Sequence, residues 1–329
     1  MTETTHTQAR PVRILAVGGT IAMSGERAVP ALDAEALVEA VPQLDAFERL
    51  EAETVLELPG PHLSLRQALA VADRAREAAD SGEGVVVTTG TDTMEELAVL
   101  CALTYGGEAP IVLTGANRPA SSAGADGPAN LLDAVSLAGS QAAVGLGVVV
   151  VFGGEIHAAT SVQKVDSTGP AAFGSPVAGP IGRIVEGRTW LHGRPIRSAP
   201  LVVARLEYRV PIVTATLGDG GDVLADLASS RDGIVLVALG AGHLSASAIG
   251  ELRVAVQQVP VVVTCRTSRP SMLFDTYGFE GSERDLRESG AVCAPFLSPP
   301  AARIALLCCL GAGLDRDGMA RALAPWDAG

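Results

Sequence analysis

Short apolar segments alternate with amphipathic segments along most of the chain. The apolar segments are rich in valine and end in glycine or threonine, as buried strands followed by tight turns do. Four of them are VRILAVGG at 12–19, VVVTTG at 85–90, PIVLTGA at 110–116 and GLGVVVVFGG at 145–154. Between them, LRQALAVADRAREAAD at 65–80 and GPANLLDAVSLAG at 127–139 have the apolar spacing of helices. This order predicts an α/β fold, with a mostly parallel sheet covered by helices on both faces.

The alternation divides the chain into two parts. It weakens between residues 166 and 208, where Gly, Pro, Ser and Arg are frequent and the pattern predicts a hairpin followed by a linker. It resumes from residue 210 with VPIVTATL, GIVLVALG and VPVVVTCRTS. We therefore expect a large, doubly wound N-terminal α/β domain at 1–198, a linker at 199–209 and a smaller C-terminal α/β domain at 210–329.

Small polar residues gather where the predicted strands end. In VVVTTGTDTMEEL, at 85–97, Thr91 and Asp92 lie between a buried strand and the start of a helix. A capped helix would explain this segment taken alone, because Asp and Thr are ordinary N-cap residues. Other strand ends carry further candidates: Thr20, Thr114, Asn117, Arg118, Ser122, Asp126, Glu155, His157 and Lys164.

The carboxyl ends of parallel strands share one edge of a sheet, and ligands of open α/β sheets bind at that edge. We therefore expect Thr20, Thr91, Asp92 and Lys164 to lie near one crevice. A hydroxyl, a base and an acid that orients the base are the groups that an activated threonine nucleophile requires. Lys164 is the only lysine among the 24 basic residues. Lysine can act as a base when its pKa is depressed, whereas arginine keeps its proton, so this lone lysine is a candidate base.

The composition excludes several classes of binding partner. The formal net charge of −13 argues against nucleic acid and anionic membrane surfaces, which attract basic proteins. The five cysteines show no metal-ligand spacing and fit a reducing cytoplasm, and no apolar run has the length of a membrane span. The glycine-rich phosphate-binding patterns are absent from the sequence. We expect a cytoplasmic enzyme without metal or cofactor that acts on a small molecule.

Four segments together resemble the signatures of the bacterial L-asparaginase family. They are ILAVGGTIA, TTGTDTMEELA, LTGANRPASSAGADGPANLLDA and QKVDSTGPAAFGSPVAGPIG. The similarity continues in the second part through VVVTCRTS and LSPPAARIALL. The family also includes glutaminase-asparaginases and an asparaginase-like subunit of a tRNA amidotransferase. The resemblance implies a homo-oligomer, a tetramer built from dimers, with each site at an interface and an amino-acid amide as substrate.

The resemblance also implies roles for particular residues. Thr20 matches the nucleophilic threonine, whereas Thr91, Asp92 and Lys164 match the family's second catalytic group. Asp92 also matches the residue that holds the amino group of the substrate. Glu283, in GSERDL, matches a glutamate that reaches the neighbouring subunit's site.

Three positions depart from the family's pattern. The loop MSGERAVPALD at 23–33 lacks the tyrosine that helps to activate the nucleophile. Gly60 stands in place of a serine that binds the substrate carboxylate, with Ser64 as a nearby hydroxyl. His243, in GAGH, stands in place of an asparagine that the partner subunit contributes.

These observations favour hydrolysis of L-asparagine to L-aspartate and ammonia through a threonine nucleophile. A glutaminase, or a hydrolase of a larger asparaginyl amide, is an alternative, because the shortened loop and Gly60 leave more room. A catalytically weak homologue that binds an amino acid is a third interpretation, and the missing tyrosine supports it. The intact set of Thr20, Thr91, Asp92 and Lys164 argues against that third interpretation.

Overall fold

The computed structural model describes residues 9–323 except 26, 28 and 270. Two residues of the loop that lacks the tyrosine, Glu26 and Ala28, thus lie outside the described part of the chain. The chain forms two compact units, Met1–Pro200 and Leu201–Gly329. Within the described residues, no helix is long and apolar enough to cross a membrane.

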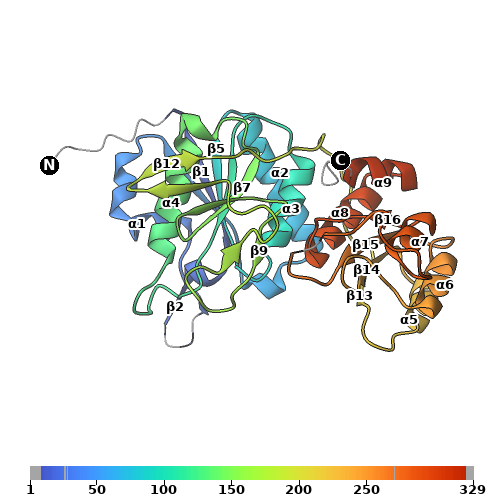
Figure 1. Cartoon of the computed structure of the whole chain (residues 1–329). Helices are drawn as coiled ribbons and strands as arrows, with labels where there is room; N and C mark the ends of the chain where they lie inside the picture. Colours follow the sequence, from blue (N-terminus) through green and yellow to red (C-terminus); the bar gives the residue numbers. More distant parts are fainter. Residues whose placement is uncertain (1–8, 26, 28, 270, 324–329) are drawn as a thin grey trace. The chain divides into compact units, whose positions relative to one another are not determined.

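The N-terminal unit is built on one sheet in the order β12-β11-β8-β7-β6-β5-β1-β4. Its strands are β1 (Val12–Gly18), β4 (Leu50–Leu58), β5 (Gly84–Thr88), β6 (Ile111–Thr114), β7 (Val148–Phe152), β8 (Glu155–Ala158), β11 (Gly182–Val185) and β12 (Arg188–Leu191). Strands β4, β1, β5, β6 and β7 are parallel to one another. Strands β8, β11 and β12 extend the sheet beyond β7 through antiparallel pairs (Figure 1). The predicted mostly parallel sheet is therefore confirmed, with an antiparallel edge.

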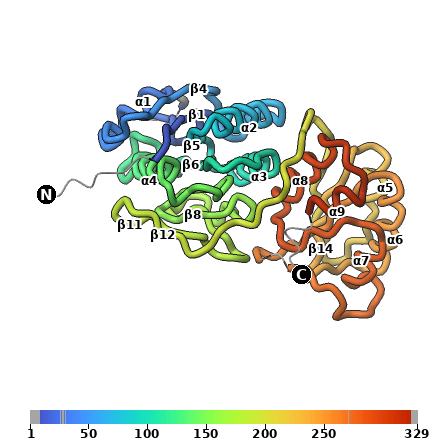
Figure 2. The backbone as a smooth tube through the Cα atoms, turned by 90° about the horizontal axis from the view of Figure 1, so that it is seen from above, coloured from blue at the N-terminus to red at the C-terminus, as the bar shows by residue number. Residues whose placement is uncertain are grey.

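Helices cover both faces of this sheet, as the pattern predicts. Helices α1 (Ala34–Glu39) and α4 (Gly127–Gly139) lie on one face, and α2 (Leu65–Asp80) and α3 (Met94–Thr104) on the other (Figure 2). The core beneath α1 and α4 takes alternate residues of successive strands, such as Ile14, Val86 and Val112, all fully buried. Leu15, Val85, Val87, Ile111 and Leu113, their neighbours in sequence, are buried as well. Strands β5 and β6 are thus apolar on both faces, which explains the continuous valine runs.

Three further short features complete the N-terminal unit. A separate two-stranded sheet is formed by β9 (Gln163–Lys164) and β10 (Phe173–Gly174). The hairpin expected between residues 166 and 208 is the antiparallel pair of β11 and β12. Another pairs β2 (Met23–Ser24) with β3 (Val29–Pro30). Single turns of 3₁₀ helix are η1 (Thr20–Ala22), η2 (Pro42–Ala46), η3 (Gly60–His62) and η4 (Gln141–Ala143).

Ser64 is the N-cap residue of α2. Its hydroxyl accepts the backbone N–H of Gln67 at 3.3 Å, and the Gln67 side chain accepts the Ser64 N–H at 3.1 Å. This reciprocal arrangement is a capping box, which satisfies two N–H groups that a helix start leaves free. The Ser64 hydroxyl is thus occupied in capping a helix.

The C-terminal unit has a sheet of four parallel strands in sequence order: β13 (Ile212–Thr214), β14 (Ile234–Ala238), β15 (Val261–Cys265) and β16 (Val292–Cys293). Its helices are α5 (Asp222–Ala228), α6 (Ala246–Ala255), α7 (Glu283–Glu288), α8 (Pro299–Gly311) and α9 (Arg316–Leu323). One core joins β14 and β15 to α6 through fully buried residues such as Ile249, Leu252 and Val263. The smaller second α/β unit is therefore confirmed.

Candidate active site

Three glycines bring separate chain segments together at the carboxyl edge of the N-terminal sheet. Gly19 follows β1, Gly60 follows β4 and Gly90 follows β5. A Cβ atom added to Gly19 would lie 2.4 Å from the Gly90 Cα, and one added to Gly90 would lie 2.6 Å from the Gly60 Cα. Gly19 also has a φ of 82°, which glycine adopts readily and other residues rarely do. The backbones can meet this closely only because no side chain separates them.

This glycine contact places two predicted threonines on neighbouring turns. Thr20 comes directly after Gly19, and Thr91 comes directly after Gly90. Thr20 is half-buried at the start of η1, whereas Thr91 is 5% exposed. The sheet edge thus carries one accessible and one shielded hydroxyl.

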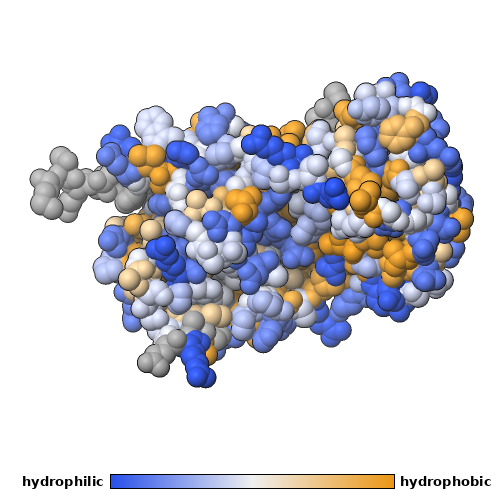
Figure 3. All heavy atoms as spheres, turned by 60° about the horizontal axis from the view of Figure 1, so that its bottom comes forward, coloured by the Kyte–Doolittle hydropathy of each residue, from blue (hydrophilic) through white to orange (hydrophobic). Residues whose placement is uncertain are grey.

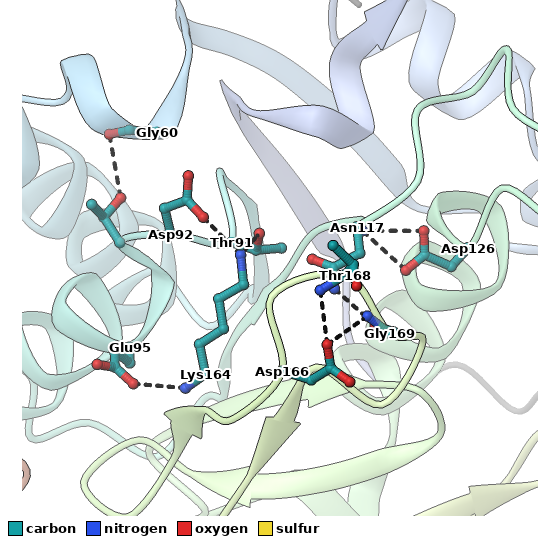
Figure 4. Close-up of polar contacts among 11 residues, drawn as sticks. Gly60, Thr91, Asp92, Glu95, Asn117, Asp126, Lys164, Asp166, Thr168 and Gly169 are labelled. Atoms are coloured by element: carbon teal, nitrogen blue, oxygen red, sulfur yellow. Dashed lines mark hydrogen bonds and ion pairs between the residues drawn. The ribbon is translucent and has the colours of Figure 1, made fainter.

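Lys164 reaches the shielded hydroxyl from the separate β9 strand. Its Nζ donates to Thr91 Oγ1 at 2.9 Å and to Asp92 Oδ1 at 2.7 Å (Figure 4). The Lys164 side chain is 18% exposed and that of Asp92 is 60% exposed. The ammonium group is therefore largely shielded, while the carboxylate it contacts remains open to solvent. The structure brings Lys164 together with Thr91 and Asp92, which lie 73 and 72 residues before it in the sequence.

A second carboxyl group contacts Lys164 at its backbone. Glu95, in the first turn of α3, accepts the Lys164 N–H on Oε2 at 2.8 Å (Figure 4). Burial is the main cause that raises the pKa of Glu95 to about 7, and Glu96 raises it further. The N–H of Lys164 and its positive charge act in the opposite direction. The sequence shows Glu95 only as an acidic residue favoured by a helix start, so this contact was missed.

The hairpin that carries Lys164 is also tied to the loop after β6. Asn117 donates from Nδ2 to the Gly169 carbonyl at 2.8 Å, and Asp166 closes the hairpin loop by accepting the Thr168 and Gly169 N–H groups. Asp126 accepts the Asn117 N–H at 3.0 Å (Figure 4). These side chains shape loops, which is the ordinary explanation for polar residues in glycine-rich segments.

Other candidates at the strand ends have structural partners. Thr114 donates to the Val151 carbonyl at 2.8 Å in the core, and Arg118 lies 3.4 Å from the Gly124 carbonyl. Ser122 lies exposed in the same loop. Glu155 pairs with Arg183 at 2.6 Å.

His157 belongs to the interior of the same unit. It is fully buried, and its Nδ1 lies 3.1 Å from Ser175 Oγ. Burial lowers the pKa of His157, so the neutral ring is favoured. This histidine thus helps to hold the chain that follows β10.

The remaining two predicted residues lie in the C-terminal unit, where they contact each other. His243 Nε2 lies 3.3 Å from Glu283 Oε2. The Glu283 side chain is fully buried, and its Oε1 accepts the backbone N–H groups of Thr276 and Tyr277. Within its own unit, Glu283 is thus held by the loop at 276–277. Substrate binding by Glu283 and His243 stays a prediction.

Gly60 lies at the sheet edge with the threonines, where its carbonyl lies 3.4 Å from Thr93 Oγ1. The predicted substrate-binding role of Gly60 stays a prediction as well. Among the described residues, no group of three or more His, Cys, Asp and Glu side chains is arranged to hold a metal ion.

A doubly wound sheet whose carboxyl edge holds an accessible hydroxyl, a shielded hydroxyl and an amine beside a carboxylate is an arrangement typical of enzymes with hydroxyl nucleophiles. Comparison with known proteins defines the class more narrowly. Residues 11–197 match the family described as "Asparaginase, N-terminal", and residues 209–323 match "Glutaminase/Asparaginase C-terminal domain".

Relatives and a solved structure agree with these matches. A "Probable L-asparaginase" of Deinococcus radiodurans is 36% identical over 94% of this chain and 95% of its own length. "L-asparaginase 2" of Escherichia coli is 33% identical over 90% and 87%, respectively. The crystal structure of a "Probable Cytoplasmic L-asparaginase" from Campylobacter jejuni superposes with a TM-score of 0.84 at 30% identity, covering 95% of this chain and 99% of that one.

The chain is therefore an asparaginase-type amidohydrolase. It belongs to the bacterial asparaginase family, as its sequence signatures indicate.

The glycine contact generates a first prediction. We expect Gly90→Ala to lower the free energy of unfolding by about 1–3 kcal/mol, because the added methyl group overpacks a site already in contact with Gly60. Gly250→Ala is the control: it lies within α6, and nothing lies within 4 Å of its added Cβ. That change should stabilise the helix by about 0.5–1 kcal/mol. Urea unfolding measures both, and a wild-type midpoint for Gly90→Ala would contradict the importance of the contact.

Proposed function

We propose that the protein hydrolyses the side-chain amide of L-asparagine, giving L-aspartate and ammonia through a threonine nucleophile. The observation that carries the proposal is the Lys164 ammonium group, which donates to both Thr91 and Asp92 at the sheet edge. A hydroxyl bound to an amine beside a carboxylate is suited to proton transfer during acyl transfer. Membership of the asparaginase family supports the same reaction.

The two threonines divide the reaction in this proposal. The Thr20 hydroxyl attacks the amide carbon, loses its proton and forms an ester, while the amide nitrogen gains a proton and leaves as ammonia. Water then attacks the ester, aspartate departs and Thr20 regains its proton. Thr91, held by Lys164, orients or activates that water. The half-buried position of Thr20 suits contact with substrate, and the buried position of Thr91 suits proton relay.

Asp92 is proposed to bind the amino group of the substrate. Only Oδ1 contacts Lys164, and the side chain is 60% exposed, so the second oxygen is available to an ammonium group. At Gly60 the chain offers no hydroxyl to a substrate carboxylate. This supports an alternative in which the substrate is glutamine or a larger asparaginyl amide, and the matching C-terminal family description names glutaminases as well.

Ammonia release from a panel of amides tests the proposal and separates these substrates. We expect turnover with L-asparagine to exceed that with L-glutamine and with asparaginyl peptides. Faster turnover of one of the other amides would favour the alternative. Binding of asparagine without ammonia release would instead indicate the third interpretation, a weakly active homologue that binds an amino acid.

The substitution Lys164→Arg tests proton transfer by Lys164 in the same ammonia assay. Arginine keeps the positive charge but remains protonated, so we expect ammonia release to fall by about 10²–10⁴-fold if Lys164 transfers a proton. Circular dichroism serves as the control for folding. Wild-type turnover in the folded variant would rule out proton transfer by Lys164.

The roles of the two threonines give a separate prediction. Thr20→Ala should not be acylated at all, whereas Thr91→Val should be acylated and then stall, because its ester is hydrolysed slowly. Intact-mass spectrometry after brief mixing with substrate and acid quenching, followed by peptide mapping, detects the adduct. An adduct on Thr91 of the wild type would reverse the assignment.

We also propose a cytoplasmic homo-oligomer. All five cysteines are free thiols in the structure, which fits a reducing compartment. Large apolar side chains remain exposed on the single chain. Examples are Trp190 at 61% and Val202 at 90% exposure. Figure 3 shows hydrophobic residues in several groups on the face that it draws. Burial of such surfaces by a second copy would stabilise an assembly.

Light scattering after size exclusion measures the assembly. We expect a dimer or a tetramer at the concentration used in the ammonia assay. A fully active monomer would contradict the proposed assembly and, with it, a role for Glu283 and His243 in a neighbour's site.

A further inference from the structure

The position of Lys164 depends on contacts outside the main sheet. Lys164 belongs to β9, which pairs only with β10 in a two-stranded sheet. Within that sheet, Lys164 lies opposite Phe173. A two-stranded hairpin is marginally stable alone, so its register on the rest of the unit has to be set by other contacts.

Several contacts tie the hairpin to the unit at some distance from Lys164. Asn117 holds the loop at Gly169, and the Phe173 ring packs on Phe152 with ring centroids 5.0 Å apart. Ser175 contacts His157. These contacts fix the loop and the second strand of the hairpin, and none of them acts on the Lys164 residue itself.

Glu95 acts on Lys164 directly. Its Oε2 accepts the Lys164 N–H at 2.8 Å, so a carboxylate in the first turn of α3 binds a backbone N–H of a distant segment. The same turn that leads into α3 carries Thr91 and Asp92, the two partners of the Lys164 ammonium group. One short segment therefore binds Lys164 at both its backbone and its side-chain end, as Figure 4 shows.

We infer that Glu95 is a positioning residue, whose carboxyl group fixes the backbone of Lys164 so that its amine reaches Thr91. The inference rests on the proposed role of Lys164 in proton transfer. Displacement of a catalytic group by about 1 Å can lower a rate about 100-fold. Without the bond to Glu95, the amine would be held to Thr91 and Asp92 only through a long, flexible side chain.

The hydrogen bond from the Lys164 N–H to Glu95, here called the tether, depends on pH through the protonation of Glu95. The pKa of Glu95 is raised to about 7, chiefly by burial. The charged groups that act on it are Glu96, on its own helix, and Lys164, on the hairpin. Because the folded-state pKa is raised, the stability that Glu95 contributes is present below its unfolded value of 4.5 and is lost as the pH rises through about 7. The N–H bond itself strengthens over the same range, since an ionised carboxylate is the stronger acceptor.

The lone lysine makes the tether directly observable. Because the sequence contains only one lysine, labelling with ¹⁵N-lysine gives a single backbone amide signal, that of Lys164. In the wild type we expect this signal to move with a midpoint near pH 7, following Glu95. In Glu95→Gln the titration should disappear while the amide stays protected from solvent exchange. In Glu95→Ala the protection should be lost as well.

Kinetics of the same variants test the consequence for the reaction. We expect Glu95→Ala to lower kcat about 10–100-fold with KM changed less than about threefold, since the tether acts on the catalytic group rather than on substrate. Glu95→Gln should restore most of kcat, because its amide oxygen accepts the same N–H. Glu96→Gln is the matched control, which removes a neighbouring charge and leaves the tether, so both kcat and the titration should persist.

Two outcomes would overturn the inference. One is a Lys164 amide signal that is equally protected in Glu95→Ala and in the wild type. The other is an unchanged kcat in Glu95→Ala when the wild type is active. Failure of the proposed function is distinguishable, because a wild type that releases no ammonia from any amide would still show the titrating amide signal.

Discussion

The close contact of three glycine backbones determines the geometry of the site. Gly19, Gly60 and Gly90 follow three adjacent parallel strands, and their Cα atoms lie too close for any side chain to intervene. Because of this contact, Thr20 and Thr91 lie on neighbouring turns although they are far apart in the sequence. The parallel sheet supplies the common edge, and the glycines allow the loops beyond it to converge.

The other half of the site comes from an element outside the sheet. Lys164 lies on a small hairpin and is bound by residues of the β5–α3 turn at both its ammonium group and its backbone N–H. Asn117, from the loop after β6, holds the hairpin loop. The glycine-rich loops and the hairpin thus form one hydrogen-bonded network, in which most polar groups support the few that can act chemically.

Of the three departures from the family's pattern, those at Gly60 and His243 fall on expected substrate contacts, whereas the missing tyrosine falls on the expected activation of the nucleophile. Lys164, Thr91 and Asp92 are assembled, whereas Gly60 offers backbone in place of a hydroxyl. A serine at this position would bring its Cβ to 3.3 Å from the Gly90 Cα, so the glycine also suits the tight packing of the edge. The contact of Lys164 with Thr91 and Asp92 is therefore formed although Gly60 departs from the family's pattern at the same sheet edge.

The sequence by itself determined the α/β class and the two units, because apolar periodicity is local and repeats along the chain. It determined the family through the resemblance of particular strand-end segments to the asparaginase signatures. It also indicated Thr91, Asp92 and Lys164, which the structure brings into contact. Only the tertiary structure decided the tether from Glu95 to Lys164 and the contact of His243 with the buried Glu283. The capping of α2 by Ser64 is local, because it joins residues three positions apart in the sequence. Glu95 and Lys164 are 69 residues apart, and a hydrogen bond between such distant segments leaves no periodic signal in either. The environment that decides whether a polar side chain positions a distant segment or reacts exists only after the chain has packed.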